Sequence, residues 1–249
     1  MEQVEVAEVA RTPLISVRGL VKSFGPVRAV DGVSLDIYAG EVLGVIGDNG
    51  AGKSTFLSLL AGFHRPDAGR LLYRGREVSL GSPRVARRRL RIEMVYQDLR
   101  LAPDLTVWEN LFLGEEPRVL GVLSNRRQMR ARAERVLREL STGIRPEDVL
   151  SELSGGEQQS VAIARAVLFD RDVVIMDEPT AAISVGKVEE VLRLVRELKG
   201  YGKTVLLVSH RLEDVLRVAD RIVVFHHGRI RRVLENCGLQ VADLVHEMF

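Results

Sequence analysis

Cysteine is nearly absent from this sequence, since Cys237 is the only one in 249 residues. A single cysteine excludes a disulfide within the chain and a metal site built on cysteines. Long apolar runs are absent as well, and none approaches the roughly 18–20 residues of a membrane-spanning helix. The formal net charge is only +2, so the composition does not require a polyanionic partner. We therefore expect a soluble, cytoplasmic chain.

The first dozen residues, MEQVEVAEVART, are acidic and have no apolar core. This composition predicts a flexible tail over residues 1–13 rather than a signal peptide. The whole sequence is 46% apolar and 28% charged, which is typical of a globular protein. Its length suits one large α/β domain with an inserted subdomain, which we place over residues 14–249.

Buried strands alternate with helices along this domain, which predicts an α/β fold around a parallel sheet. The runs EVLGVIG, DVVIMDEP and KTVLLVSH, at 41–47, 172–179 and 203–210, are apolar enough for strands buried on both faces. Further strands are expected over 14–20, 33–40 and 92–97, a short β-ribbon over 71–78 and a late hairpin over 221–230. Helices are expected over 54–63 and 188–198. From about 98 to 165 the strand pattern disappears and helical spacing predicts an inserted helical subdomain, so that the core comprises 14–97 and 166–249.

The segment GDNGAGKST, residues 47–55, lies between a predicted strand and a predicted helix. It fits the pattern G-x-x-x-x-G-K-[ST], in which glycines let backbone N–H groups converge on phosphates. Lys53 would reach the β and γ phosphate oxygens, and the Ser54 hydroxyl would ligate Mg²⁺. The alternative is a chance glycine-rich turn, which the flanking strand and helix disfavour. The predicted phosphate-binding residues are Gly47, Asp48, Asn49, Gly50, Ala51, Gly52, Lys53, Ser54 and Thr55.

Two carboxylates, Asp177 and Glu178, end the apolar run VVIMDEP. A buried acidic pair is costly unless a cation accompanies it, and Mg²⁺ beside a bound nucleotide supplies that cation. We expect Asp177 to hold the metal through water and Glu178 to polarise the attacking water. Both residue types are also common as helix N-caps after a strand, so the pair alone leaves two interpretations open. The phosphate loop upstream favours the catalytic one.

Gln97 and His210 each follow the end of a predicted strand. The carboxyl ends of parallel strands form the ligand crevice of an open α/β sheet. Taken singly, each side chain is better explained as an ordinary surface or satisfied polar group. Because both accompany the phosphate loop and the acidic pair, we expect His210 to contact the γ-phosphate and Gln97 to contact the metal or its water.

A second glycine pair stands in ELSGGEQQSVAIARA, residues 152–166, directly before a helical pattern. This arrangement is also typical of anion binding at a helix N-terminus. The run LSGGEQQ at 153–159 resembles the signature loop of the ATP-binding subunits of ABC transporters, and the features above resemble the other motifs of that family. The resemblance runs from about residue 14 past residue 228, nearly the whole chain. It implies a P-loop NTPase (RecA-like) core with an N-terminal antiparallel β subdomain, besides the inserted α-helical subdomain.

The resemblance also explains why one chain has two phosphate-binding loops. In this family two subunits pack head to tail, and each lends its signature loop to the ATP held by the other. The implied contacts in trans are Ser154, Gly155, Gly156 and Glu157. Phe24 falls where the family has an aromatic that stacks on adenine, although a core position is the ordinary alternative. Ser184 stands where the family commonly has an aspartate that connects the two sites, which puts that connection in doubt.

A narrower resemblance lies in residues 92–114 and 178–182, which look like ATPases of ribose-, xylose- and fructose-type importers. It implies an ATPase that uses ATP and Mg²⁺ to power carbohydrate import. The implied partners are a second ATPase subunit, expected to be a copy of this chain, integral-membrane permease subunits and, indirectly, a periplasmic-type sugar-binding protein. The alternatives are an exporter, an importer of another solute, or a soluble ABC ATPase that acts on nucleic acid or the ribosome.

The same resemblance places the chain at the inner face of the cell membrane, held there by the permease. The stretch from Leu99 to Trp108 is the expected docking surface. Helix packing is the ordinary alternative for Trp108 and Leu111, which could also serve both purposes. The one dense basic run is RVARRRLR at 84–91. A solvated face is its ordinary explanation, with lipid headgroups or nucleic acid as the alternative contacts. We expect no nucleic-acid partner.

Overall fold

The computed structural model describes residues 12–79, 81–96, 98–119, 122–123, 125–181 and 185–248. Its central sheet consists of β3 (Val42–Gly47), β6 (Ile92–Val95), β9 (Val173–Asp177), β10 (Thr204–Val208), β11 (Arg221–His226) and β12 (Arg229–Glu235). The strand order is β12-β11-β3-β10-β9-β6. All neighbours pair in parallel except β12, which forms the predicted late hairpin with β11.

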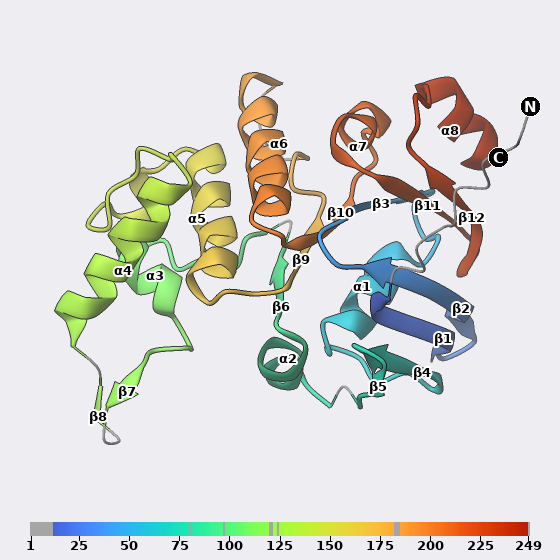
Figure 1. Ribbon diagram of the computed structural model, residues 1–249, viewed down its shortest axis with the longest axis horizontal. Helices are drawn as coiled ribbons and strands as arrows, with labels where there is room; N and C mark the ends of the chain where they lie inside the picture. The colour runs from blue at the N-terminus through green and yellow to red at the C-terminus, as the bar shows by residue number, and fades with distance from the viewer. Residues whose placement is uncertain are drawn as a thin grey trace, which may run out of the picture.

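The central sheet is buried on both faces, as the apolar runs predict. Along β3, Val42 and Ile46 join one core cluster, whereas Leu43 and Val45 join the other, because successive side chains of a strand point to opposite faces. One face is covered by α6 (Val185–Gly200), α7 (Leu212–Val218) and α8 (Val241–Met248). Helix α1 (Lys53–Leu60) covers the other face (Figure 1).

A second, antiparallel sheet packs beyond α1 and is formed by β1 (Pro13–Phe24), β2 (Val27–Tyr38), β4 (Ala68–Tyr73) and β5 (Arg76–Glu77), in the order β2-β1-β4-β5. Strands β1 and β2 are longer than predicted and meet in a tight turn at Gly25, whose φ is 57°. Strand β1 begins at Pro13, inside the segment predicted as a tail. Residues 1–11 of that predicted tail lie outside the described residues.

Helices α3 (Val107–Phe112), α4 (Arg126–Glu139) and α5 (Gly155–Leu168) pack together at one end of the molecule (Figure 1). The expectation that no strand interrupts 98–165 was wrong, since β7 (Arg118–Val119) and β8 (Val122–Leu123) form an antiparallel ribbon. Two-residue strands are too short to produce a recognisable alternation. Helix α5 also continues to Leu168, past the residue where the helical subdomain was expected to end.

The basic run lies in a short helical segment, α2 (Pro83–Val85), which continues as a π-helix (η1) over Ala86–Leu90. Within the described residues, no helix has both the length and the apolar character of a bilayer span.

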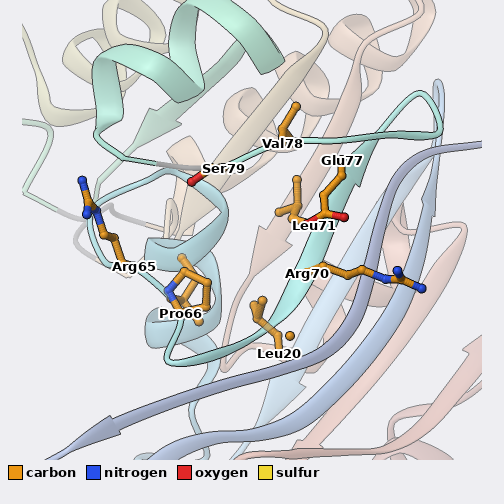
Figure 2. Close-up of a pocket in the computed structure, with 10 residues that line it drawn as sticks. Leu20, Arg65, Pro66, Arg70, Leu71, Glu77, Val78 and Ser79 are labelled. Carbon is orange, nitrogen blue, oxygen red and sulfur yellow. The ribbon is translucent and has the colours of Figure 1, made fainter.

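A hollow of about 190 Å³ lies between β1, β4 and the segment after α1 (Figure 2). Leu20, Pro66 and Leu71 line it, while Arg65 and Arg70 point in opposite directions (Figure 2). None of the predicted site residues lies among those that line this hollow.

Candidate functional site

The predicted site residues meet at the carboxyl edge of the central sheet. Strand β10 lies between β3 and β9, and Val208 at its end pairs with Val45 on one side and with Asp177 on the other. The phosphate loop leaves β3 after Gly47, and His210 follows the end of β10. Three neighbouring strands therefore deliver the phosphate loop, the acidic pair and the histidine to one edge.

The glycines of the loop are required by its path. Gly47 has a φ of 143° and Gly52 a φ of 102°, in the range that residues with side chains rarely adopt. A Cβ at Gly47 would overlap the Phe225 carbonyl oxygen, and one at Gly52 would overlap the Ala29 carbonyl oxygen. Within the loop, the Ala51 amide donates to the Asp48 carbonyl at 3.1 Å. Asn49 and Gly50 are exposed, so one side of the loop faces solvent.

Helix α1 begins directly at the end of this loop. Its N-cap is Gly52, which has no side chain to accept a bond from the first turn. The amides of Lys53, Ser54 and Thr55 are in the first turn and have no acceptor within the helix. These donors, with the positive end of the helix dipole, form a ready anion site.

Lys53 bends back over the same loop. Its Nζ donates to the carbonyl oxygens of Gly47 at 2.6 Å and Asp48 at 2.9 Å, and the residue is only 8% exposed. Burial lowers the pKa of Lys53, while the charges of Glu178, Asp177 and Asp48 act in the opposite direction. The ammonium group is thus held at the mouth of the anion site, where two carboxylates face it.

Asp177 and Ser54 lie on the metal side of the site. The Ser54 hydroxyl is 3.5 Å from Oδ1 of Asp177. Burial raises the pKa of Asp177, the bond from Ser54 and the charge of Lys53 lower it, and the charge of Glu178 raises it further. A divalent cation between the hydroxyl and the carboxylate would offset the cost of burying that negative charge.

Among the described residues, no three His, Cys, Asp or Glu side chains come together as a metal-binding group. Mg²⁺ typically takes one or two protein ligands and completes its shell with water and substrate phosphates. One hydroxyl and one carboxylate next to a phosphate site therefore fit Mg²⁺. Gln97, the third predicted ligand, lies outside the described residues, as does Ser184.

Glu178 and His210 are in direct contact. Nδ1 of His210 lies 2.7 Å from Oε2 of Glu178, and the His210 amide donates to the same oxygen at 3.3 Å. Glu178 has a φ of 53°, and its amide donates to the Val208 carbonyl at 3.0 Å, which fixes the turn at the end of β9. The helix N-cap interpretation accounts for neither contact of the Glu178 carboxylate.

The next turn is held by a buried pair that sequence analysis missed. The Thr180 hydroxyl donates to Oδ2 of Asp214 at 2.9 Å, and both residues are buried. This bond ties the segment after Glu178 to α7. The spacing of 34 residues leaves no local pattern by which the pair could have been found.

Phe24 ends β1 and is 43% exposed, so it is not a core residue. Its ring packs edge-on against the His64 ring, with centroids 5.0 Å apart. Lys22 Nζ lies 5.6 Å from the ring centroid and pairs with Asp67 at 2.8 Å. The Asp67 carboxylate also accepts the Ser23 amide at 2.6 Å. The aromatic side chain is therefore presented to solvent on a supported strand end.

The signature loop begins α5 with a capping box. The Ser154 hydroxyl and amide both donate to Oε2 of Glu157, at 2.6 and 2.8 Å, and the Glu157 amide donates back to the hydroxyl at 3.4 Å. The bonds from Ser154 lower the pKa of Glu157. The S-x-x-E spacing is a recognised sign of this motif, and sequence analysis overlooked it here.

The signature loop and the phosphate loop stand apart within one chain. Ser154 and Gly155 are exposed, and Gly156 is packed near Lys187 of α6. Figure 1 shows α5 and α1 separated, with β6 and β9 between them. The structure therefore brings Lys53, Ser54, Asp177, Glu178 and His210 together and leaves Ser154 to Glu157 elsewhere.

The expected docking stretch divides into exposed and buried parts. Leu99 is half-buried and lines two surface hollows. Trp108 is 5% exposed and Leu111 is fully buried in the core of the helical part. Helix packing, the alternative weighed for these two residues, is confirmed for both.

Comparisons with known proteins identify the family of this chain. A family model described as ABC transporter matches residues 30–181. This chain belongs to the ABC transporter family. A ribose import ATP-binding protein of Rhodococcus jostii is 44% identical over 95% of this chain and 47% of that protein. A xylose/arabinose import ATP-binding protein of Sulfolobus acidocaldarius is 44% identical over 87% of this chain and 86% of that protein.

Solved structures agree with the family. A dimeric ATP-binding cassette bound to ADP and Pi, in a post-hydrolysis state, has a TM-score of 0.75 and 26% identity, and the match covers 90% of this chain and 100% of that one. The predicted α/β fold of a P-loop NTPase is confirmed. This ABC cassette spans about half the length of its Rhodococcus relative and most of its Sulfolobus relative.

Proposed function

We propose that this chain binds and hydrolyses ATP and thereby powers the import of a carbohydrate through separate membrane subunits. The observation that carries the proposal is the meeting of Lys53, Asp177 and Glu178 at one edge of the sheet, beside an uncapped helix N-terminus. The assignment to carbohydrate import rests on the relatives, whose names are ribose and xylose/arabinose import ATP-binding proteins.

In this proposal the phosphates of ATP lie in the loop from Gly47 to Thr55. The amides at the start of α1 donate to phosphate oxygens, and Lys53 exchanges its carbonyl acceptors for the β and γ phosphates. Phe24 stacks on the base, which the exposure of its ring permits. ATP is thus held at both ends by residues of one chain.

Glu178 is the general base in this scheme. A carboxylate only accepts hydrogen bonds, so Nδ1 of His210 must donate in the 2.7 Å contact with Glu178. This contact fixes the orientation of the Glu178 carboxylate while its other oxygen is available to a water. A bond from His210 to the γ-phosphate requires a proton on Nε2 as well, because phosphate oxygens accept hydrogen bonds. Glu178 takes the proton of the attacking water, and Lys53 stabilises the charge that develops on the phosphate.

Ser54 and Asp177 are the residues that would hold Mg²⁺, with Gln97 as a further proposed ligand. The bound ion would neutralise charge on the β and γ phosphates. Burial raises the pKa of the half-buried Asp177, and a cation beside this carboxylate would favour its charged form.

We further propose that the site is completed by a second copy of this chain. Ser154 and Gly155 are exposed at the start of α5 and apart from the phosphate loop of their own chain. The amides of Gly155 and Gly156, which take no part in the capping box, can then face the γ-phosphate held by a partner. The dimeric cassette among the similar structures supports this arrangement. The remaining proposed partners are permease subunits and, through them, a sugar-binding protein. The chain then works at the cytoplasmic face of the membrane.

The test of the proposal is phosphate release by the purified chain with ATP and Mg²⁺. Lys53→Ala should lower turnover by about 10²–10⁴-fold, because the main positive charge at the phosphates is removed. Lys199→Ala is the matched control, since Lys199 pairs with Asp220 on the surface, away from the phosphate loop. Turnover of Lys53→Ala near that of the control, with no contaminating ATPase, would contradict the site.

A further inference from the structure

The phosphate loop contains a chemically labile dipeptide. The sequence has four asparagines, and only Asn49 is followed by a glycine. In an Asn-Gly pair the glycine nitrogen can attack the amide carbon of the asparagine side chain, because glycine has no Cβ to hinder the close approach. The reaction needs a side chain that can turn toward the backbone and an N–H group that is not engaged elsewhere. In a folded protein it therefore depends on whether neighbouring groups hold these two.

Asn49 and Gly50 form the unbonded tip of the phosphate loop. Both are exposed, and within the described residues neither the Asn49 side chain nor the Gly50 amide makes a hydrogen bond. Gly50 has a φ of 79°, and no atom beyond its chain neighbours lies within 4 Å of the place where a Cβ would stand. The turn is closed by the bond from the Ala51 amide to the Asp48 carbonyl at 3.1 Å. The rotation that brings the Gly50 nitrogen to the side chain therefore opposes a single hydrogen bond.

The other residues capable of this chemistry are held in place. Asn110, Asn125 and Asn236 each make side-chain hydrogen bonds to backbone groups, and each precedes a residue with a side chain. Asn110 is also fully buried. One aspartate precedes a glycine, Asp31, and its carboxylate is fixed by ion pairs with two arginines. Asn49 alone thus combines the glycine neighbour with an unheld side chain among the described residues.

The charges around the loop favour the attack. Negative charge develops first on the Gly50 nitrogen and then on the oxygen of a tetrahedral intermediate. The positive end of α1 begins at Lys53, and the Lys53 ammonium donates to the Asp48 carbonyl at 2.9 Å, one residue before Asn49. Groups arranged to hold a phosphate also stabilise a developing oxyanion. The features that make this loop an anion site therefore promote the reaction of its own asparagine.

We propose that Asn49 is a site of spontaneous deamidation, which inactivates the phosphate loop and which a bound nucleotide blocks. The Gly50 nitrogen bonds to Cγ of Asn49, the side-chain nitrogen leaves as ammonia with the Gly50 amide proton, and a cyclic imide remains. Water then opens the imide at either carbonyl and yields aspartate or isoaspartate. Overall, water is consumed, ammonia is released, and no further reactant is required.

Both products impair an anion site. Each adds a negative charge next to Asp48, where phosphates would bind, and isoaspartate also lengthens the backbone by one methylene group. A bound nucleotide blocks the attack, because the amides of such a loop donate to phosphate oxygens and the Gly50 amide is then engaged. The block and the inactivation rest on the proposed function, since they require that this loop binds phosphates. The deamidation itself does not.

The first experiment measures the reaction in the isolated chain, incubated at mildly alkaline pH without nucleotide. Isoaspartate is quantified by enzymatic methyl transfer and located by mass spectrometry of the peptides. It should accumulate at residue 49, while Asn125, which is also exposed, should stay intact. Asn49→Gln should remove the signal, because the larger ring that a glutamine must form closes much more slowly. An intact Asn49 after prolonged incubation would overturn the proposal.

The second experiment tests the block by a nucleotide. ADP with Mg²⁺ is the probe, because it is not consumed, and AMP is the control, because it has no β-phosphate. At an ADP concentration about 100 times its Kd, about 1% of the loops are free, so the rate of deamidation should fall by about 100-fold. AMP should leave the rate unchanged. An unchanged rate with ADP bound would overturn the block.

The third experiment tests the inactivation. Asn49→Asp is one of the two products, and it should bind ADP about tenfold more weakly than the wild-type chain or weaker still, because like charges then face each other. Wild-type affinity of Asn49→Asp would overturn the inactivation. A wild-type chain that binds no ADP would overturn the proposed function, while the first experiment still decides whether Asn49 deamidates.

Discussion

Replacement of Phe24 by alanine separates the nucleotide-binding role of this residue from a structural one. Phe24 is 43% exposed, and its contacts are the edge of His64 and the ammonium of Lys22. Truncation should therefore cost folding much less than the roughly 3–5 kcal/mol of a fully buried Phe→Ala change. Loss of a stacked base costs about 1–3 kcal/mol, which corresponds to about 5- to 150-fold weaker ATP binding.

The assay compares ligands that differ only in the part Phe24 is expected to contact. ATP, GTP and inorganic tripolyphosphate are titrated calorimetrically with Mg²⁺ into wild type and Phe24→Ala. ATP and GTP should weaken alike, because stacking discriminates little between bases, and tripolyphosphate should bind unchanged. Phe63→Ala is the control, since Phe63 is similarly exposed but packs against Tyr96 instead. Equal weakening of tripolyphosphate, or unchanged ATP affinity, would refute the stacking role.

Two other substitutions test the capping box and the docking stretch. The hydrogen bonds from Ser154 lower the pKa of Glu157 from its ordinary value of 4.5. The ionised carboxylate therefore stabilises the fold at pH values above 4.5, and this stabilisation is lost as the pH falls through the lowered pKa of the folded state. The difference in urea midpoint between wild type and Glu157→Gln should thus narrow as the pH is lowered from 7 toward 3, and a constant difference would exclude the ionised capping box. Leu99→Asp should abolish assembly with the permease but leave the basal ATPase activity and the Tm unchanged. Trp108→Asp should instead unfold the chain, because Trp108 is 5% exposed and a buried charge is costly. A normal Tm for Trp108→Asp would contradict the place of Trp108 in the core.

The central sheet and the nucleotide site could be predicted because their signals are local. Val42 to Gly47 is one continuous apolar run that leads into the glycine loop, and Asp177 and Glu178 end another. Parallel strands then bring their carboxyl ends together at one edge without further information. The antiparallel sheet was predicted less completely. The halves of β1 and β2 next to their connecting turn are partly exposed, and register shifts in β1 break the alternation of buried and exposed side chains.

A cluster of three arginines around the buried Glu93 could not be predicted from local pattern. Arg87, Glu93 and Arg165 come from separate elements and Arg171 from the loop before β9. Arg171 is 78 residues from the Glu93 it contacts. The single sign in the sequence was a glutamate inside the apolar strand IEMV.

The burial of Trp108 was also left open, because one helix pattern fits both a docking face and a face packed between α4 and α5. Which of these holds depends on tertiary contacts.

The measurement that tests the shared site most directly is the molecular mass of Glu178→Gln in solution. This variant keeps the shape of the side chain but removes the base, so ATP should bind and persist. Bound ATP would bridge Lys53 of one chain to Ser154 and Gly156 of the other. Light scattering should then show a dimer with ATP and Mg²⁺, a monomer with ADP, and a monomer again when Ser154→Arg is added. A Glu178→Gln protein that stays monomeric with saturating bound ATP would contradict the account.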